Sequence, residues 1–337
     1  NQIIKSGLKN TIYVVMAQTV SILLGLARGL ILPIILGVSG FGYWQVYLLY
    51  VSYVGLFAFG FNDGIYLRYG KYEFQDLPKP VLRSSIRIFI IIQLIITPLI
   101  FLIFMFEPDK SKQVAMMWAS INIPIAGLSG VFVYTLQITN QLKKYSLYSV
   151  VDKIIMLVVI VMMFIIKIDN FIIVIIFDTL GKVFVLFLMA YSLKEIIIGP
   201  GCDIKTAYDE LRKNISVGIK LMLANLTGML VLGIGRFIVE RFESVEVYGT
   251  YSFAISTMNL VLMFVSAIGL VIYPTLNRLK YDLFPKYFKN INQLLVVIGF
   301  GFLLMYFPLR IFIRRYMVDY VKIFEYLPVL FAVIFIQ

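Results

Sequence analysis

Two arginines are the residues of this chain best placed for chemistry, because each lies inside a long apolar segment. Arg28 and Arg236 are 208 positions apart, and the sequence around them repeats at nearly the same offset. A cation in the middle of a bilayer costs about 2.5–3.5 kcal/mol on insertion scales, so a sequence retains one where it meets a polar environment. Two such cations at matching places predict a shared polar cavity into which both guanidinium groups face.

The repeat around the arginines is marked by glycines at corresponding positions. The matching glycines are Gly7 with Gly218, Gly42 with Gly249 and Gly60 with Gly269, at offsets of 211, 207 and 209 residues. These offsets differ by only a few residues along each half. Their agreement indicates that the chain contains two related halves.

The two arginines differ in their local partners. Arg28 has no acidic residue three or four positions away, so nothing on its own helix neutralises it. Its structural alternatives are snorkelling to the membrane surface or a partner on another helix. Arg236 is followed four residues later by Glu240, which leaves two interpretations open, a local ion pair or an arginine that faces the cavity. Arg28 is therefore the strongest single candidate for a binding residue.

One further charged pair lies in the middle of an apolar segment. Asp178 and Lys182 are four residues apart, close enough on a helix to neutralise each other. They are interpreted either as a structural pair or as the site where a coupling cation, H⁺ or Na⁺, meets a membrane carboxylate.

The composition identifies the membrane as the solvent of this chain. Hydrophobic residues make up 61% of its 337 residues and charged residues only 14%, and the mean hydropathy is +0.93. With no histidine and a single cysteine, Cys202, the chain lacks the residues for a zinc site, a histidine general base or an internal disulfide. Neither Gly70-Lys71 nor Gly181-Lys182 has the upstream glycine of a phosphate-binding loop. The sequence predicts no cofactor, no metal and no enzymatic activity.

Apolar stretches of about twenty residues predict the membrane spans. They lie at 12–36, 43–61, 86–106, 114–138, 150–166, 171–191, 216–240, 248–273 and 291–313, and a tenth begins near residue 326. These runs are about twice as long as a membrane β-strand and do not alternate, so helices are the structure that satisfies their backbone groups. We predict an all-α integral membrane protein, a polytopic helical bundle.

The basic residues between the spans predict the orientation of the chain. With a cytoplasmic N-terminus, the inner connections hold sixteen Lys and Arg residues and the outer ones hold seven. The net charge of +12 is interpreted as a signal of topology and of contact with membrane lipids, not of nucleic-acid binding. Because the chain begins at Asn1 without a methionine and ends at Gln337 within an apolar stretch, it is expected to be a fragment of a longer protein.

The longest connection divides the predicted bundle into two lobes. In residues 192–215, the apolar side chains Ile204, Tyr208, Leu211 and Ile215 share one helical face, which predicts an amphipathic helix at the cytoplasmic surface. Six spans precede this linker, so the second half enters the membrane in the same sense as the first. We predict an N-terminal lobe at 1–191 and a truncated C-terminal lobe at 216–337, two parallel pseudo-symmetric six-helix lobes with a cleft between them.

Small residues beside both arginines predict packing or hinge positions. Gly25 and Gly29 flank Arg28 at a spacing that lets another helix approach, and Pro33 removes a backbone hydrogen bond and predicts a bend. Gly233 and Gly235 precede Arg236 and loosen the seventh helix in the same way. Helix packing is the default interpretation, and hinge function is the alternative.

The segments around both arginines resemble a known family. Residues 28–43 read RGLILPIILGVSGFGY and residues 60–70 read GFNDGIYLRYG, and both are similar to the first two helices of bacterial Wzx-like oligosaccharide-lipid flippases. These proteins belong to the multidrug/oligosaccharidyl-lipid/polysaccharide exporter superfamily. The second half repeats the resemblance at 235–238, 248–253 and 273–278. The specific motifs cover about a third of the chain.

The resemblance implies twelve to fourteen helices in two lobes around a cationic central cavity. It implies a flippase that moves a polyprenyl-pyrophosphate-linked oligosaccharide across the bacterial cytoplasmic membrane by alternating access. Arg28 and Arg236 would then grip the phosphates in a bidentate fork, with Asp178 as the place for a coupling H⁺ or Na⁺. The expected partners are the lipid-linked oligosaccharide, membrane lipids and the polysaccharide polymerase machinery.

Two other functions stay open. A cation-coupled multidrug antiporter of the same superfamily would share the fold, but such an exporter binds its cargo through membrane carboxylates, and here basic residues outnumber acidic ones within the spans. A non-transporting membrane scaffold would keep the paired arginines for packing alone. Drug sensitivity and polysaccharide export in a deletion strain separate these functions.

Overall fold

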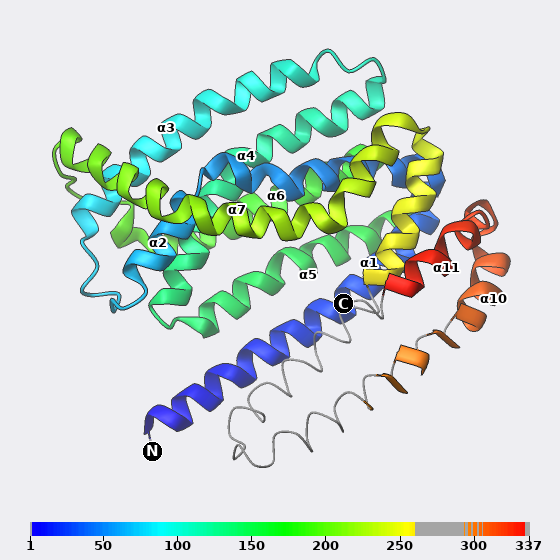
Figure 1. Ribbon diagram of the computed structural model, residues 1–337, viewed down its shortest axis with the longest axis horizontal. Coiled ribbons are helices and arrows are strands. Elements are labelled where there is room, and N and C mark those ends of the chain that lie inside the picture. Colours follow the sequence, from blue (N-terminus) through cyan, green and yellow to red (C-terminus); the bar gives the residue numbers. More distant parts are fainter. Residues whose placement is uncertain are drawn as a thin grey trace.

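The structure is a computed structural model that describes the backbone of residues 2–259, 293, 296–297, 299–301, 303–304 and 306–333. Within these ranges, the side chains of residues 2–19, 22–24, 26–28, 232 and 330–333 are not described. Every regular element in the described part of the chain is a helix (Figure 1). Six described helical stretches are long and apolar enough to cross a membrane. The prediction of an all-α polytopic membrane protein is confirmed.

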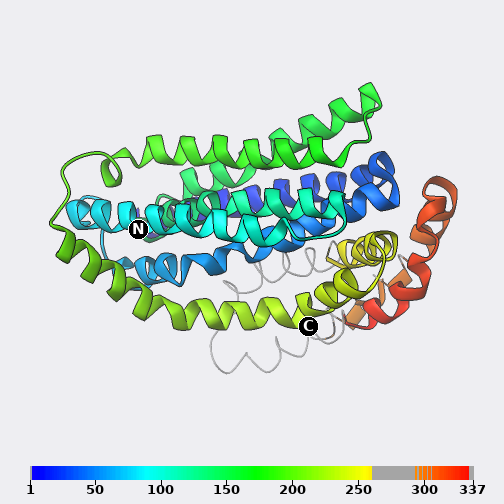
Figure 2. The same cartoon turned by 90° about the horizontal axis from the view of Figure 1, so that it is seen from above.

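The first predicted span and part of the second, which was expected at 43–61, form one helical element, α1 (Gln2–Tyr53), which is divided into two arms at Gly37. This residue has φ 64° and ψ −176°, a conformation that glycine adopts without the steric cost of a Cβ atom. The chain reverses its direction there, as both views show (Figures 1 and 2). Pro33, where the sequence predicted a bend, lies within helical backbone.

The second arm of α1 continues through a break into a short helix. After the 3₁₀ turn η1 (Val54–Ala58), Phe59 and Gly60 adopt left-handed conformations before α2 (Phe61–Tyr69) begins. Such a break frees backbone carbonyls, which need other donors inside a membrane bundle. Gln93 supplies one, because its Nε2 donates to the main-chain oxygen of Phe57 at 2.5 Å. The break brings the polar start of α2 into the interior of the bundle, where Asn62 is 8% exposed.

Four long helices complete the first half of the chain. They are α3 (Lys79–Phe104), α4 (Lys110–Ile138), α5 (Leu142–Ile166) and α6 (Phe171–Ser192), followed by the short turn η2 (Lys194–Ile196). Half of the most apolar stretch of α4 is buried, against 17% for α3 and 22% for α5. We therefore place α4 at the centre of this half, and the outward faces of α3 and α5, rich in isoleucine and leucine, face lipid.

The helix α7 (Ile204–Phe242) is continuous across the predicted linker and the predicted seventh span. Its first turn is capped by Asp203, whose carboxylate accepts from the amide of Thr206, and this bond lowers the pKa of Asp203 below its ordinary value. The boundaries of the linker and the lobes stay a prediction. On the predicted amphipathic face, Leu211 is buried whereas Ile204 and Tyr208 are exposed.

Residues 245–259 form the next described helix, and further elements follow later in the chain. These are α10 (Tyr306–Tyr316), η4 (Val318–Tyr320) and α11 (Ile323–Val333), the last of which overlaps the span predicted to begin near residue 326. The predicted spans 248–273 and 291–313 extend beyond the described residues.

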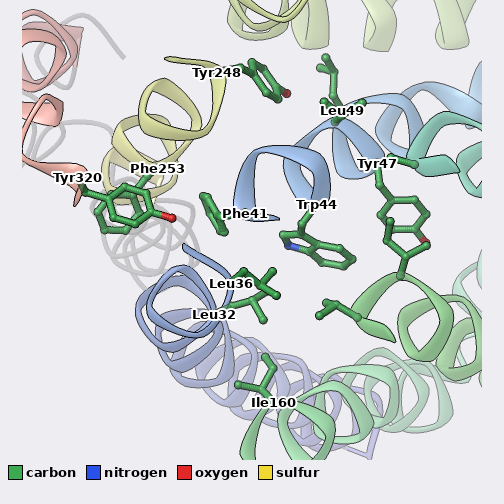
Figure 3. Packing of buried hydrophobic residues seen from close by; sticks show 14 of the residues in the cluster. Leu32, Leu36, Phe41, Trp44, Tyr47, Leu49, Ile160, Tyr248, Phe253 and Tyr320 are labelled. Carbon is green, nitrogen blue, oxygen red and sulfur yellow. The ribbon is translucent and has the colours of Figure 1, made fainter. Parts of the chain in front are cut away.

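Two apolar clusters join these helices. In the first, the second arm of α1 contributes Phe41, whose ring meets Phe253 edge-on at 6.2 Å and Tyr320 at 6.3 Å (Figure 3). In the second, Phe61 of α2 stacks on Phe89 of α3 at 4.6 Å, and Leu211 of α7 packs against the same group. Both clusters therefore bind the later helices to the first half of the chain.

Glycines allow the closest approach between the first half and the later helices. A Cβ atom on Gly218 would overlap the main-chain oxygen of Gly60, and one on Gly249 would lie 3.2 Å from the Cα atom of Gly42. Gly42 and Gly249 are matching glycines of the internal repeat. One matching pair of the repeat thus lies in close contact, and the pseudo-symmetry of two lobes stays a prediction.

Candidate functional site

A cavity of about 450 Å³ lies between the second arm of α1, the C-terminal part of α7 and the helix at 245–259. Its walls are largely apolar, with a small number of polar groups, a composition typical of ligand-binding sites. The polar groups in the lining belong to Ser52, Tyr53, Arg236, Tyr251 and Asn259. Among the described residues of this lining, Arg236 is the one that carries a charge.

Arg236 is held by neutral acceptors. Its Nη2 donates to Oε1 of Gln45 at 2.9 Å and to the hydroxyl of Tyr248 at 3.3 Å. The Tyr248 hydroxyl in turn donates to the main-chain oxygen of Gln45 at 3.2 Å. The Nε atom of Arg236 is buried, and no described residue supplies an acceptor for it. Because a buried donor without an acceptor costs about 1–3 kcal/mol, this atom points to a ligand that completes the site.

Glu240, the local partner considered for Arg236, is bound elsewhere. Its carboxylate forms an ion pair with Nζ of Lys112 on α4 at 2.6 Å, and its side chain is only 2% exposed. The Lys112 ammonium also donates to the main-chain oxygen of Glu240 at 3.1 Å. The positive charge of Arg236 therefore stays in the cavity wall.

The glycines before Arg236 make room for the aromatic groups of the cavity. A Cβ atom on Gly233 would overlap the hydroxyl of Tyr53, and one on Gly235 would lie 2.9 Å from the hydroxyl of Tyr251. Both glycines lie within the helical part of α7. Their observed role is to let the two tyrosines approach the helix beside Arg236.

A second cavity of about 370 Å³ adjoins the first, because Ser52 and Met229 line both. It lies between η1, the start of α2, the middle of α4 and α7. Asn62 and Asp63 line it, and Tyr134 of α4 donates to the Asp63 carboxylate at 3.3 Å. The two cavities follow α7 in series, the first beside Arg236 and the second beside the break in the second membrane helix.

Near the start of α7, at the end away from Arg236, a polar network joins this helix to α2. Arg68 of α2 binds both carboxylate oxygens of Glu210, at 2.5 and 3.1 Å. Glu210 also accepts from the hydroxyl of Tyr69 at 2.6 Å and from the amide of Asn214 at 3.0 Å. The side chain of Glu210 is 10% exposed and that of Arg68 is 26% exposed. Ion pairs thus bind the first half to α7 near both ends of that helix. Arg68–Glu210 lies near its start, and Lys112–Glu240 lies near its end, where Arg241 also pairs with Glu107 at 3.9 Å.

Asp178 and Lys182 form the ion pair that their spacing allowed, with 2.6 Å between Nζ and Oδ2. The hydroxyl of Tyr47 donates to the same carboxylate at 2.8 Å and receives a hydrogen bond from Asn122 at 3.2 Å. This network lies within the first half and joins α1, α4 and α6. Lys182 also lines a smaller cavity of about 190 Å³, together with Asp152 and Lys153.

Several residues of the site could not be found by spacing along the chain. The partners of Arg236 and Glu240, which are Gln45 and Lys112, lie 191 and 128 residues away from them. The sequence signal that could have pointed to them was a polar residue in an unexpected place. Gln45 lies within an apolar run, and Asn62 and Asp63 directly follow the same run. The side chain of Arg28 lies outside the described residues, as does the placement of Gly269.

These features define a polytopic helical membrane protein with an arginine in the wall of a largely apolar cavity between its first half and α7. A family model described as "Polysaccharide biosynthesis protein" matches residues 7–280, which is most of the chain. The chain therefore belongs to this polysaccharide biosynthesis family, and the resemblance to Wzx-like flippases is confirmed at the family level. No curated protein and no solved structure gives a significant match.

Proposed function

We propose that this protein is a flippase that moves a polyprenyl-pyrophosphate-linked oligosaccharide across the cytoplasmic membrane by alternating access. The observation that carries the proposal is the environment of Arg236, a cation in a cavity wall whose Nε atom has no acceptor among the described residues. Membership of a polysaccharide biosynthesis family supports a saccharide-bearing cargo.

The cavity chemistry fits the phosphate part of such a cargo. A guanidinium group binds phosphate through two parallel N–H bonds, and both its charge and its planar shape favour this anion. The Nε atom of Arg236 is free for one of these bonds, and the hydroxyls of Tyr53 and Tyr251 add further donors nearby. Arg28 is proposed as the second cation that binds the phosphates, because it matches Arg236 in the internal repeat of the sequence.

Alternating access requires that each end of the cleft can close and open. The ion pairs Arg68–Glu210 and Lys112–Glu240 bind α7 to the first half on the two sides of the cavities. Both pairs are formed in this structure. We infer an occluded arrangement, from which breaking one pair opens the cleft toward one side of the membrane.

The charges of the membrane interior favour this function over a cation antiporter. The carboxylate of Asp178 is neutralised by Lys182 at 2.6 Å, so it is not a free site for a cationic drug. The charged residue that lines the larger cavity is an arginine, which repels cations and attracts phosphate. The pairing of Asp178 also argues that any coupling to H⁺ or Na⁺ first requires Lys182 to move.

The test is to replace Arg236 in a surface-polysaccharide producer in which the native gene is deleted. Arg236→Ala and Arg236→Gln are expected to abolish export, and Arg236→Lys is expected to restore only a small part, because an ammonium cannot form the planar fork. Arg212→Ala is the matched control, since that side chain is exposed on the same helix and lines neither of the two cavities.

Arg28→Ala is expected to give the same defect as Arg236→Ala. Protein amounts in the membrane are measured for every variant, so that a loss of folding is separated from a loss of transport. Normal export by the double variant Arg28→Ala/Arg236→Ala would refute the phosphate-binding proposal.

A further inference from the structure

The cavity next to that of Arg236 has a different chemical character. Its polar lining comes from hydroxyls, amides and one carboxylate on α1, α2, α4 and α7, and the described lining residues include no basic one. These polar residues are Ser52, Asn62, Asp63, Ser129, Tyr134 and Asn225. Such groups accept and donate hydrogen bonds but do not attract an anion.

Asn62 provides an independent sign that this cavity receives a ligand. Its side chain is more than nine-tenths buried, and its Nδ2 donates to the main-chain oxygen of Gly127 at 3.0 Å. That bond fixes the orientation of the amide. The Oδ1 atom is buried, and no group in the described part of the chain donates to it. The acceptor is therefore preorganised for a hydroxyl or amide group that the protein itself does not supply.

Asp63 places a second acceptor next to Asn62 on the same turn of α2. Its carboxylate receives a hydrogen bond from Tyr134, and a carboxylate can accept several. The ring of Tyr134 lies 5.0 Å from that of Tyr66, so aromatic surface stands beside the two acceptors. A saccharide carries the groups that match this arrangement, since its neighbouring hydroxyls donate hydrogen bonds and the face of its ring is apolar.

We propose that this second cavity is the saccharide subsite of the protein, in which Asn62 and Asp63 accept hydrogen bonds from sugar hydroxyls. This inference rests on the proposed function for its cargo but concerns a separate part of that cargo. A lipid-linked oligosaccharide has its first sugar directly after its phosphates. The two cavities are likewise adjacent, since Ser52 and Met229 line both. Asn62 and Asp63 are then specificity-determining residues, and Arg236 binds what all such cargoes share.

The experiment measures equilibrium binding to the purified full chain with radiolabelled lipids. The probes are undecaprenyl pyrophosphate without sugar and the same lipid with one hexose, one N-acetylhexosamine or one hexuronate. For the native protein, at least one sugar-bearing lipid is expected to bind about tenfold or more tightly than the sugarless lipid, from one or two hydrogen bonds to a charged acceptor.

The variants separate the two subsites. Asp63→Asn, which keeps the shape of the side chain, is expected to remove most of the preference for the sugar and to leave binding of the sugarless lipid unchanged. Asn62→Leu is expected to act in the same way. Arg236→Gln is expected to weaken binding of all four lipids by a similar factor. Asp76→Asn is the control, the same chemical change at an exposed position outside the cavity.

Each outcome decides between the proposals. If Asp63→Asn and Asn62→Leu both keep the full sugar preference, or if no sugar-bearing lipid exceeds the sugarless one, the saccharide subsite is refuted while the flippase proposal survives. If the native protein binds none of the four lipids, the proposed function fails as well. If Na⁺ rather than a lipid stabilises the native protein against heat and Asp63→Asn removes that effect, the cavity is a cation site and the saccharide proposal is overturned.

Discussion

The ion pair between Arg68 and Glu210 is the contact proposed to hold one end of the cleft closed, and its strength can be measured. In Arg68→Gln, the Glu210 carboxylate loses two charge-assisted bonds of 2.5 and 3.1 Å and keeps those from Tyr69 and Asn214. Removing one partner of a fully buried pair costs about 3–5 kcal/mol. Because 26% of the Arg68 side chain is exposed and two donors remain, we expect about 2–3 kcal/mol. Glu210→Gln keeps an acceptor oxygen for the arginine, so its expected cost is about 1–2 kcal/mol.

These values are tested with a double-mutant cycle. The free energy of unfolding is measured by titration of SDS into mixed micelles for both single variants and for Arg68→Gln/Glu210→Gln. The expected coupling energy is about 1–2 kcal/mol. The control cycle uses Lys79 and Glu195, whose atoms are also 2.5 Å apart but whose carboxylate is 56% exposed, so solvent screens the attraction and no measurable coupling is expected. Equal coupling in the two cycles would refute the assignment of Arg68–Glu210 as a closing pair.

Three further predictions concern other parts of the molecule. Gly218→Ala is expected to stop polysaccharide export, since its Cβ atom would overlap the main chain before α2. Gly228→Ala is the control and is expected to be tolerated, because its Cβ atom would meet no atom within 4 Å. Normal export by Gly218→Ala together with a loss of export by Gly228→Ala would contradict the close contact between the helices. Lys182→Met leaves the Asp178 carboxylate without its cation and should destabilise the protein by about 2–4 kcal/mol in SDS titration, and a second change, Asp178→Asn, should recover most of this loss unless the pair has no structural role. Burial raises the pKa of Asp63 above its ordinary value, so as the pH falls the sugar preference should be lost at a pH above that of an exposed aspartate, about 3.9, and a preference that persists well below that pH would show that the carboxylate is not needed.

The helical bundle could be predicted from the sequence because the membrane leaves few alternatives. The predicted spans 114–138 and 171–191 lie within α4 and α6 and share an end with them or nearly so, since polar residues bound these apolar runs on both sides. The break at Phe59–Gly60 was not predicted. Its signal was a glycine at the end of an apolar run, and whether such a glycine ends a helix or bends it depends on donors from other helices, here Gln93.

The site could be predicted only where it depends on neighbours in the sequence. The four-residue spacing of Asp178 and Lys182 was sufficient to expect their ion pair. The same spacing suggested Arg236 with Glu240, yet Lys112 takes that carboxylate, because α4 brings an ammonium from another part of the chain to within 2.6 Å. Spacing describes one helix at a time, and competition between partners is decided by packing between helices.

The continuity of α7 links the two closing pairs mechanically. Glu210 and Glu240 lie near the two ends of one helix, about 45 Å apart at 1.5 Å of rise per residue, and the Arg236 cavity lies between them. A helix that tilts about the close contact at Gly218 moves its far end much more than the contact itself. We expect such a tilt to separate Glu240 from Lys112 while Glu210 keeps its bonds to Arg68, so that the proposed opening occurs on one side only. With a flexible joint between residues 210 and 240, the two ends of α7 would move independently, and the cavity could open on both sides at once. This gives a physical reason for the amphipathic segment and the membrane span to form one uninterrupted helix.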